Sequence, residues 1–487
     1  MADYKWDEAN LRDLFTLCAD VNFEKYELSG SNDSAPASVL LIYCSGMCNN
    51  ADIDRYVLPG ILELYRKHTI SSSMQLEEHL KLRTRPVDDH LHSENMVRDI
   101  FSGQLLLRFE PLGKLFAIDL ADPPKRTTEE PNTEVSVRGP KDGFTEEVSV
   151  NLALIRKRLK SNQLAVESFT FGNETETKVY LLYMNNKILP EIASEIRCRL
   201  AKVKRTELIS STQLEETLAG FSLFPLFAYT GRPDFAVNSL MHGRFILLVN
   251  GSPTASIAPV TLSFLLNTSE DAHTLNIFVM FTRMMRLVGL LLSLFLPGFW
   301  IALLAYHQDQ IPFSLLATLV ISRQGVPLPV PLEAFVMLLL FELFREAGMR
   351  LPSAFGQTLS VVGGLIIGQA AISAGITAPG ILVIVAISVL ATFTLVNQHM
   401  VGIVSLLRVG VLLISGFLGM FGFLFSLLAI ALYLVNLKSF GIYYMEPLAP
   451  PSLKDVWKVW FRIPWGRQFK VPGILQGMKR SGGGKRR

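Results

Sequence analysis

The fold is decided by the stretch Leu287–Tyr306, which reads LVGLLLSLFLPGFWIALLAY and carries no charged side chain. A helix needs about 20 apolar residues to cross a bilayer, and this stretch has that length. From here to Leu437 the chain stays largely apolar, whereas up to about Gly243 it has the mixed, charged composition of a soluble protein. We therefore expect a soluble N-terminal region followed by an α-helical membrane domain.

About six crossings account for the apolar region. The second is unusual, because the segment Val326-Pro327-Leu328-Pro329-Val330-Pro331 interrupts it. The last run, Val401–Val435, is too long for one crossing, so we divide it near Gly419–Gly422 into a fifth and a sixth. The other crossings are predicted at Leu287–Tyr306, at Ile311–Ile321 with Leu332–Phe344 on the two sides of the break, at Leu359–Ile376 and at Ile381–Val396.

The charges of the loops indicate the orientation of these crossings. The loops Ala305–Ile311 and Gly375–Gly380 contain no lysine or arginine. The alternate loops are basic, with Arg283, Arg286, Arg345, Arg350 and the lysine- and arginine-rich tail. Basic loops stay on the cytoplasmic side, so both termini are predicted there. The start, Met1–Asn10, lacks an apolar signal segment, which agrees with a cytoplasmic N-terminal region. The net charge of +3 and the basic tail favour membrane lipid, and no nucleic acid, as a partner.

The soluble region is predicted to be α/β in two subdomains. The domain boundaries follow the composition: 1–135 and 136–283 for the subdomains, the second with a connector, 284–437 for the transmembrane domain and 438–487 for a basic cytoplasmic tail. Strands are expected at Ser38–Tyr43, Gln104–Phe109, Leu115–Ile118, Ser168–Phe171, Lys178–Met184 and Arg244–Val249. Helices are expected at Asp52–Lys67, Pro190–Lys202 and Val148–Lys160, the last with a basic face of Arg156, Lys157, Arg158 and Lys160.

Nothing in the sequence indicates catalysis. The cysteines Cys18, Cys44, Cys48 and Cys198 lack the paired spacing of a zinc site and are expected to be reduced. Metalloprotease, serine-hydrolase and phosphate-loop patterns do not occur in the sequence. We therefore expect no catalytic residue, no metal site, no cofactor and no enzymatic activity.

The proline-broken second crossing is the candidate functional site. Pro327, Pro329 and Pro331 interrupt the helix, and broken helices at membrane depth usually line a cavity or a pathway. Glu333 and Glu342 follow the break, Arg323 precedes it, and carboxylates inside a crossing are functional candidates by default. The hypothesis is an ion pathway that includes Glu333, Glu342 and Arg323, with Gln369 of the third crossing.

Structural alternatives exist for each of these polar groups. Glu342, Arg345 and Glu346 have the spacing of an interfacial ion-pair cluster. Glu333 and Glu342 are nine residues apart and point to nearly opposite faces, so both cannot face one narrow channel from a straight helix. Gln369 lies in a segment whose small residues favour helix packing. Arg408 in the fifth crossing is expected to extend to the cytoplasmic face.

Several short blocks of the sequence stand out in a fixed order. They are Val137–Glu146 (VRGPKDGFTE), Asn151–Arg156, Gly231–Asp234, Gly243–Arg244, Leu248–Pro253, Leu296–Phe299, His307–Pro312, Ser322–Arg323, Val326–Pro329, Phe341–Glu342, Glu346–Pro352 and Ser360–Ala371. Together these blocks resemble the GerA family of spore germination receptor A subunits, and the match preserves order and spacing from about Val39 to Val396. One departure is Glu270-Asp271-Ala272-His273, where the family often has Glu-Asp-Tyr-Tyr.

The resemblance implies a multi-pass protein of the inner membrane of a bacterial endospore, with its N-terminal domain on the spore core side. It implies a homo-oligomer that conducts monovalent cations and works with transporter-like and lipoprotein subunits. The chain is also similar to the stage V sporulation protein AF branch of the same family. The leading hypothesis is thus a cation channel opened by a germination signal. The alternative is a non-conducting membrane scaffold or sensor; a secondary transporter is disfavoured because one break and no internal repeat occur.

Overall fold

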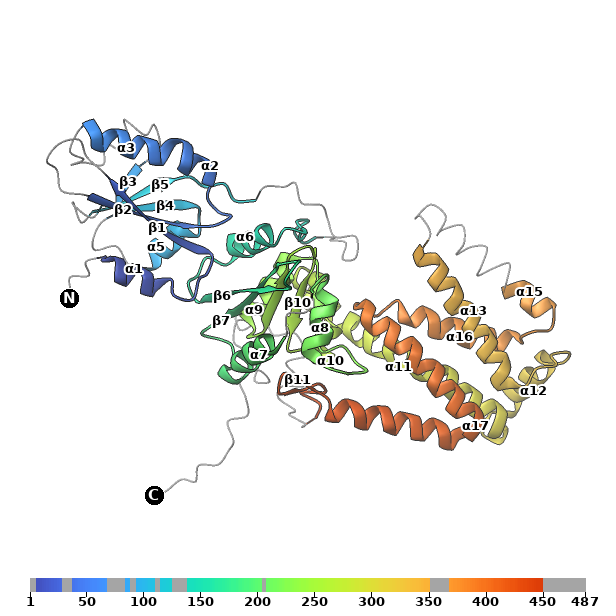
Figure 1. Cartoon of the computed structure of the whole chain (residues 1–487). Helices are drawn as coiled ribbons and strands as arrows, with labels where there is room; N and C mark the ends of the chain where they lie inside the picture. Colours follow the sequence, from blue (N-terminus) through green and yellow to red (C-terminus); the bar gives the residue numbers. More distant parts are fainter. Residues whose placement is uncertain are drawn as a thin grey trace, which may run out of the picture. The chain divides into compact units, whose positions relative to one another are not determined.

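The computed structural model describes residues 6–28, 37–67, 84–87, 93–109, 114–124, 138–203, 207–350 and 368–449 (Figure 1). These residues form two compact units. We call the first the N-terminal unit; it contains the described residues of 6–221 together with Leu226–Pro259. The second, the helical unit, contains Ser222–Pro225 and the described residues of 260–449. The domain boundaries predicted from composition stay predictions.

The N-terminal unit begins with a five-stranded sheet in the order β1-β2-β4-β5-β3, in which every strand pair is antiparallel. Its strands are β1 (Val21–Leu28), β2 (Ala37–Cys44), β3 (Thr84–Val87), β4 (Gln104–Phe109) and β5 (Lys114–Asp119). Helices lie on both faces of this sheet: α1 (Glu8–Leu14) and α5 (Ser93–Ile100) on one, and α2 (Asn50–Asp52), the π-helical turn Ile53–Val57 and α3 (Leu58–Lys67) on the other.

The apolar run of β2 forms a central strand because both of its faces are buried. Leu41 packs with Ile53 and Val57 on the face of α3, and Leu40 packs with Leu11 and Ile100 on the face of α1 and α5. Successive side chains of a strand point to opposite faces, so a strand covered on both sides needs an unbroken apolar sequence.

A second five-stranded sheet has the order β6-β7-β9-β10-β8, again with antiparallel pairs. It is accompanied by the helices α6 (Val148–Arg158), α7 (Pro190–Lys202), α8 (Ser211–Ala219) and α9 (Pro233–Met241). Its strands are β6 (Leu164–Phe171), β7 (Thr177–Met184), β8 (Ala228–Thr230), β9 (Phe245–Val249) and β10 (Ala255–Ala258). The α/β character of this region is confirmed, and each predicted helix and strand is present with some ends shifted: β6 begins earlier than predicted, and α6 ends earlier.

The predicted basic face of α6 is wrong at Arg156, and Lys160 lies beyond the last residue of the helix, Arg158. Arg156 is completely buried and forms a two-pronged ion pair with Asp20, whose side chain is 1% exposed. The helix faces inward at this position because its neighbours Leu152, Ala153 and Ile155 are core residues. A buried counter-ion, which the local sequence does not reveal, therefore keeps this arginine away from solvent.

The N-terminal unit should lose stability as the pH rises through the range from about 4.5 to about 7. Burial raises the pKa of Glu215 in α8 from 4.5 to about 7, although Ser256 donates a hydrogen bond to it. Between these values the unfolded chain releases the proton and the folded chain keeps it, so the free energy of unfolding falls, by at most about 3 kcal/mol. Urea unfolding at several pH values should show this decline.

Replacing Glu215 with glutamine should flatten that pH dependence and raise the free energy of unfolding at pH 8. The neighbouring Glu216 is exposed, so Glu216→Gln serves as the matched control and should leave the decline in place. An identical decline in wild type and Glu215→Gln would show that another group titrates.

The helical unit is built around two long helices, α11 (Asn276–Tyr306) and α17 (Gln398–Asn436). Among the described residues, these two helices are long and apolar enough to cross a membrane. Four helices follow α11 and precede α17 along the chain: α12 (Phe313–Ser322), α13 (Val330–Arg350), α15 (Gly368–Ser373) and α16 (Pro379–Thr392). Short elements flank the pair: α10 (Leu262–Leu265) and the 3₁₀ turns Ser269–Ala272 and Gln308–Gln310 come early, and the strands β11 (Lys438–Ser439) and β12 (Ile442–Tyr443) follow α17.

The predicted crossings correspond to these helices with shifted ends. The first lies inside α11, which begins earlier, at Asn276, and the fourth lies largely within α16. The second is interrupted as predicted, because α12 and α13 are separate helices. Of the third, residues 359–367 lie outside the described part of the chain. The total of six crossings stays a prediction.

α17 is a helical hairpin that turns at Gly419. This glycine has φ 63° and ψ −142°, a conformation outside the helical region, and Figure 1 shows the two legs of α17 meeting at an acute angle. The Tyr306 ring lies against the turn: a Cβ atom on Gly419 would come within 2.9 Å of Cγ of Tyr306. The predicted division of the run Val401–Val435 thus coincides with a break in the backbone.

Replacing Gly419 with alanine should lower the melting temperature of the purified chain in detergent. A residue with a Cβ atom is strained by about 1–2 kcal/mol at positive φ, and the contact with Tyr306 adds to this. Gly410 on the same helix has no atom within 4 Å of a built Cβ, so Gly410→Ala is the control. Equal melting temperatures for the two variants would contradict a strained turn at Gly419.

Candidate functional site

The irregular segment between α12 and α13 is held by an arginine. Arg323 follows the last residue of α12, and its Nη2 donates a hydrogen bond of 3.2 Å to the carbonyl of Leu328 inside the break. Prolines remove backbone donors and leave carbonyls without helical partners, so a side-chain donor is needed here. Pro327 and Pro329 lie in the break, whereas Pro331 is the second residue of α13, where a missing N–H is tolerated.

Glu333 lies one turn after the break and is completely buried. Its Oε1 accepts hydrogen bonds from the Thr377 hydroxyl, at 3.0 Å, and from the backbone N–H of Ala378. Ala378 precedes the first residue of α16, so this carboxylate lies at the amino end of α16 as well as near that of α13. Amino ends of helices carry partial positive charge, so both are complementary to an acidic side chain at this position.

The second carboxylate oxygen of Glu333 has fewer polar contacts than the first. Oε2 is buried and accepts no hydrogen bond from the described residues. It lies 3.4 Å from Nη2 of Arg323, which is an ion-pair contact without hydrogen-bond alignment. Two predicted site residues, Arg323 and Glu333, are thus brought together, and one carboxylate oxygen keeps acceptor capacity.

Glu342 belongs to a separate group of charges. Its Oε2 is 2.6 Å from Nη2 of Arg345, and its Oε1 accepts from Nη2 of Arg408. Arg408 also donates to the hydroxyls of Ser388, at 3.1 Å, and Ser405, at 3.3 Å. Glu333 and Glu342 therefore have different partners, and the ion pair of Glu342 with Arg345 is the one that the helical spacing suggested.

The expectation that Arg408 extends to the surface is wrong. Its side chain is 0% exposed and lies where α17 meets α13 and α16. The reason is the carboxylate of Glu342 across the helix interface, which offers a partner inside the unit. The sequence signal was present, because Arg408 is the only charged residue from Val401 to Leu437. A lone charge in such an apolar run calls for an internal partner.

Gln369 is not part of either group. It lies in α15 with an exposed side chain and makes no hydrogen bond with Arg323, Glu333 or Glu342 in the described part of the chain. Sequence reasoning also missed Thr377 and Ser388, whose side chains are buried. Thr377 donates to Glu333, whereas Ser388 accepts from Arg408, the partner of Glu342. Small hydroxyl residues in apolar helices carry little sequence signal, because they serve packing as often as hydrogen bonding.

The segment Glu270–His273, which departs from the family pattern, forms ion pairs within the chain through Asp271. Asp271 accepts from Nη2 of Arg286 at 3.0 Å and from Nε of Arg283 at 3.2 Å. It also forms a capping box with Thr268. These contacts tie the turn before α11 to the first turns of that helix.

The described residues offer no alternative reactive centre. No group of three or more histidine, cysteine, aspartate or glutamate side chains among them could hold a metal ion. Burial raises the pKa of Cys18 to about 11 and that of Cys48 to about 12, so both thiols stay protonated at neutral pH.

The family described as "Bacillus/Clostridium GerA spore germination protein" matches residues 9–474. Spore germination protein XA of Bacillus anthracis is 46% identical over 96% of this chain and 95% of its own length. Spore germination protein KA of Bacillus subtilis is 32% identical over 89% of this chain and 80% of its own length.

One solved structure is also similar. The N-terminal domain of the A subunit of the Bacillus megaterium spore germinant receptor GerK3 is 24% identical, with a TM-score of 0.38, and the match covers 51% of this chain and 93% of that domain. The relatives are named as germination proteins and not as enzymes. The match of the family over nearly the whole length shows that this chain belongs to the GerA family of spore germination proteins.

Proposed function

We propose that this chain is the membrane subunit of a spore germination receptor and forms, as a homo-oligomer, a channel for monovalent cations that a germination signal opens. Membership in the GerA family supports the receptor role. The observation that carries the channel is the buried carboxylate of Glu333 directly after a broken helix. A buried charge at such a place is costly and marks ion pathways by default.

The lengths of the two helices support this arrangement. α12 has ten residues and is thus about 15 Å long, half of a hydrocarbon core of about 30 Å. The break after α12 therefore falls near the middle of the bilayer if α12 starts at a membrane surface. A signal opens the channel when it binds more tightly to the open state than to the closed one.

The two carboxylates have different proposed roles. Glu333 has an oxygen with remaining acceptor capacity and is proposed to contact permeating cations, with Arg323 as its partner in the closed state. Glu342 has both oxygens engaged by arginines, so we propose a structural role for it. Gln369, exposed on α15, is proposed to face either lipid or a neighbouring subunit.

The variant Glu333→Gln should slow potassium release from germinating spores and change the cation preference of the reconstituted channel. Glutamine keeps the size of the side chain and removes the charge that would replace part of the hydration shell of a cation. Glu346→Gln, an exposed carboxylate on the same helix, is the matched control and should leave both properties unchanged. Release rate and reversal potential are the measurements; unchanged values for Glu333→Gln would remove this residue from the pathway.

A non-conducting scaffold is the rival function, and the internal pairing of Glu342 with Arg408 favours it. The test is to reconstitute the purified chain in liposomes together with the other receptor subunits. A chain that oligomerises there and passes no cation would support the scaffold.

The receptor proposal includes transporter-like and lipoprotein subunits as partners, the inner spore membrane as location and both termini on the core side. Cys198 is exposed in the N-terminal unit and can report the side by its reaction with an impermeant thiol reagent.

A further inference from the structure

An aromatic segment far from α17 in sequence is anchored at the end of that helix. Ser222–Pro225 belongs to the helical unit although it lies between α8 and β8. The backbone N–H of Leu223 donates to the Tyr433 hydroxyl at 2.9 Å. The ring of Phe224 lies 6.1 Å from that of Tyr433 and 6.0 Å from that of Tyr444, and its side chain is buried. The segment therefore has a defined place beside Tyr433.

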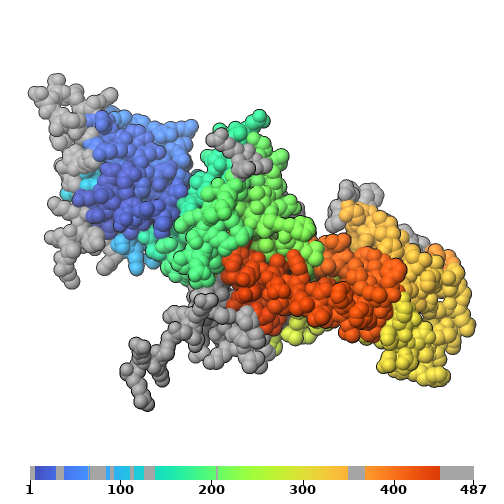
Figure 2. All heavy atoms as spheres, turned by 60° about the horizontal axis from the view of Figure 1, so that its bottom comes forward, coloured from blue at the N-terminus to red at the C-terminus, as the bar shows by residue number. Residues whose placement is uncertain are grey.

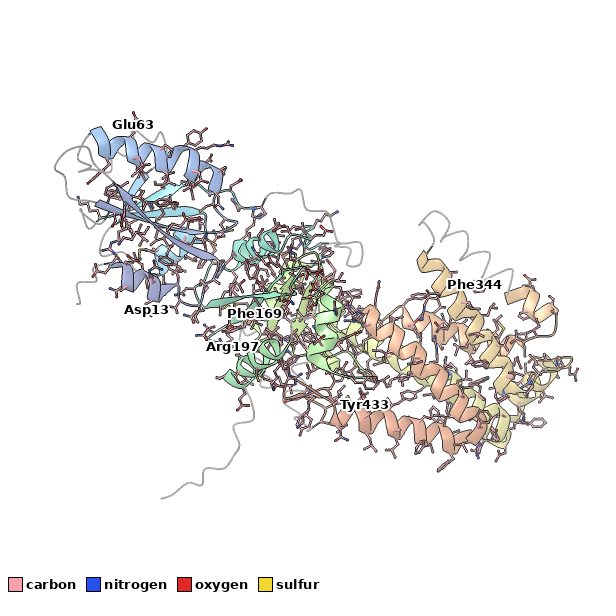
Figure 3. All side chains as sticks on the ribbon, viewed as in Figure 1. Asp13, Glu63, Phe169, Arg197, Phe344 and Tyr433 are labelled. Atoms are coloured by element: carbon pink, nitrogen blue, oxygen red, sulfur yellow. The ribbon has the colours of Figure 1, made fainter. Side chains whose placement is uncertain are left out.

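Tyr433 lies at the position where the apolar helix ends. No charged residue occurs between Arg408 and Lys438, and α17 ends at Asn436. Figure 3 shows Tyr433 near the end of α17 that leads to β11, and Nζ of Lys438 lies 4.5 Å from the centre of the Tyr443 ring. Tyrosine and lysine at the end of an apolar helix are typical of the membrane–water interface. When α17 crosses a membrane, as the proposed function requires, the segment beside Tyr433 is expected at the depth of the lipid headgroups.

Phe221 is the residue directly before this segment, and its side chain is fully exposed, at 105%. Gly220, with φ 70° and ψ −171°, ends α8 in a conformation that only glycine adopts readily and separates Phe221 from the helix. Burying a phenylalanine side chain is worth about 1.5–3 kcal/mol, so full exposure to water is unfavourable. Adjacent Cα atoms are about 3.8 Å apart, which keeps Phe221 close to the anchored segment.

We propose that Phe221 inserts into the lipid bilayer at the interface where α17 ends. The partner is the boundary between headgroups and acyl chains, which accepts an aromatic ring without requiring a charged group. The same end of α17 presents Leu428 and Leu432, 57% and 54% exposed, which face lipid when the helix crosses the membrane (Figure 2 shows this part of the chain at the surface). Phe221 thereby extends the lipid-contacting surface to the chain segment that follows α8.

The inference rests on α17 crossing the membrane, as the proposed function requires, and can be tested with spin labels on the full-length chain. The background carries Cys198→Ser, since the described cysteines Cys18, Cys44 and Cys48 are buried. Single variants Phe221→Cys, Ile209→Cys and Leu428→Cys are labelled with a nitroxide in vesicles of phosphatidylcholine and phosphatidylglycerol. Collision with oxygen, which enters lipid, is compared with collision with a water-soluble nickel chelate.

We expect the ratio of oxygen to nickel accessibility at 221 to be several-fold higher than at 209 and closer to the ratio at 428. Ile209 is 80% exposed and precedes α8, so it is an apolar control at the opposite end of the same helix. A ratio at 221 equal to that at 209, with 428 in lipid, would overturn this inference and leave the crossing intact. Low accessibility to both reagents at 221 would overturn it too, because a protein would then cover the site. An aqueous ratio at 428 would instead refute the crossing of α17.

Discussion

Replacing Arg156 with methionine is expected to lower the free energy of unfolding of the N-terminal unit by about 3–5 kcal/mol, because it leaves Asp20 buried without a counter-charge. Arg156 donates to both oxygens of Asp20, at 2.6 and 2.7 Å. It also donates to the carbonyls of Ser161 and Leu164, and its guanidinium lies 4.0 Å from the centre of the Phe101 ring. Urea unfolding of the full-length chain in detergent, followed by hydrogen exchange of β2 and β6, measures the loss.

Two further variants identify the cause of that loss. The double variant Arg156→Met with Asp20→Leu removes the unpaired charge and should recover much of the stability, although the two carbonyls stay without their donor. Arg197→Met removes an arginine whose ion pair with Glu167 is half-exposed, and it should change stability by less than about 1 kcal/mol. If Arg156→Met is as stable as the double variant or more stable, the unpaired charge of Asp20 is not the cause of the loss.

Replacing Arg408 with methionine is expected to destabilise the helical unit by about 3 kcal/mol and to lower the amount of folded chain in the membrane. Arg408 is fully buried and connects three helices through Glu342 of α13, Ser388 of α16 and Ser405 of its own helix. Arg345 still contacts Glu342 in the variant, so the loss is smaller than for an isolated charge. The thermal melting of the purified chain in nanodiscs measures it.

The partner and a surface lysine supply the comparison for Arg408. Arg408→Met combined with Glu342→Gln should melt above Arg408→Met alone, since no surplus negative charge then stays inside the unit. Lys438→Met changes an exposed cation after the end of α17 and should melt like the wild type. If Arg408→Met also melts like the wild type, the arginine reaches the headgroups and the buried pair does not stabilise the unit.

Elements with a local cause were predictable from the chain alone. α7 occupies Pro190–Lys202 as expected, because a proline suits the first turn of a helix and the apolar residues recur with its period. The break before α13 and the turn at Gly419 were predicted for the same reason: proline and glycine act on the backbone where they stand. The start of α11 at Asn276 was not predicted. Its first turns contain Arg283 and Arg286 among apolar residues, and a prediction from hydropathy leaves such charged turns out of a crossing.

The candidate site was half predictable. That Glu333 and Glu342 need an explanation follows from carboxylates in apolar segments, and their nine-residue separation indicates different faces. Their partners did not follow, because Thr377 and Arg408 are 44 and 66 residues away along the chain. The same holds for Arg156, whose partner Asp20 is 136 residues distant and belongs to the other sheet region.

The amino-acid chain alone thus specified a charged α/β region before an apolar helical one, the interruption at the prolines, the division at Gly419 and, through its motifs, the family. Each of these depends on composition, period or a residue with restricted backbone geometry. Tertiary structure alone decided that Arg156 and Arg408 lie inside, that Glu333 meets the amino end of α16, and that Leu223 is anchored to Tyr433 while Phe221 is exposed. These features depend on which faces of distant segments pack together, because that packing determines whether a charged side chain is buried and which partner it finds.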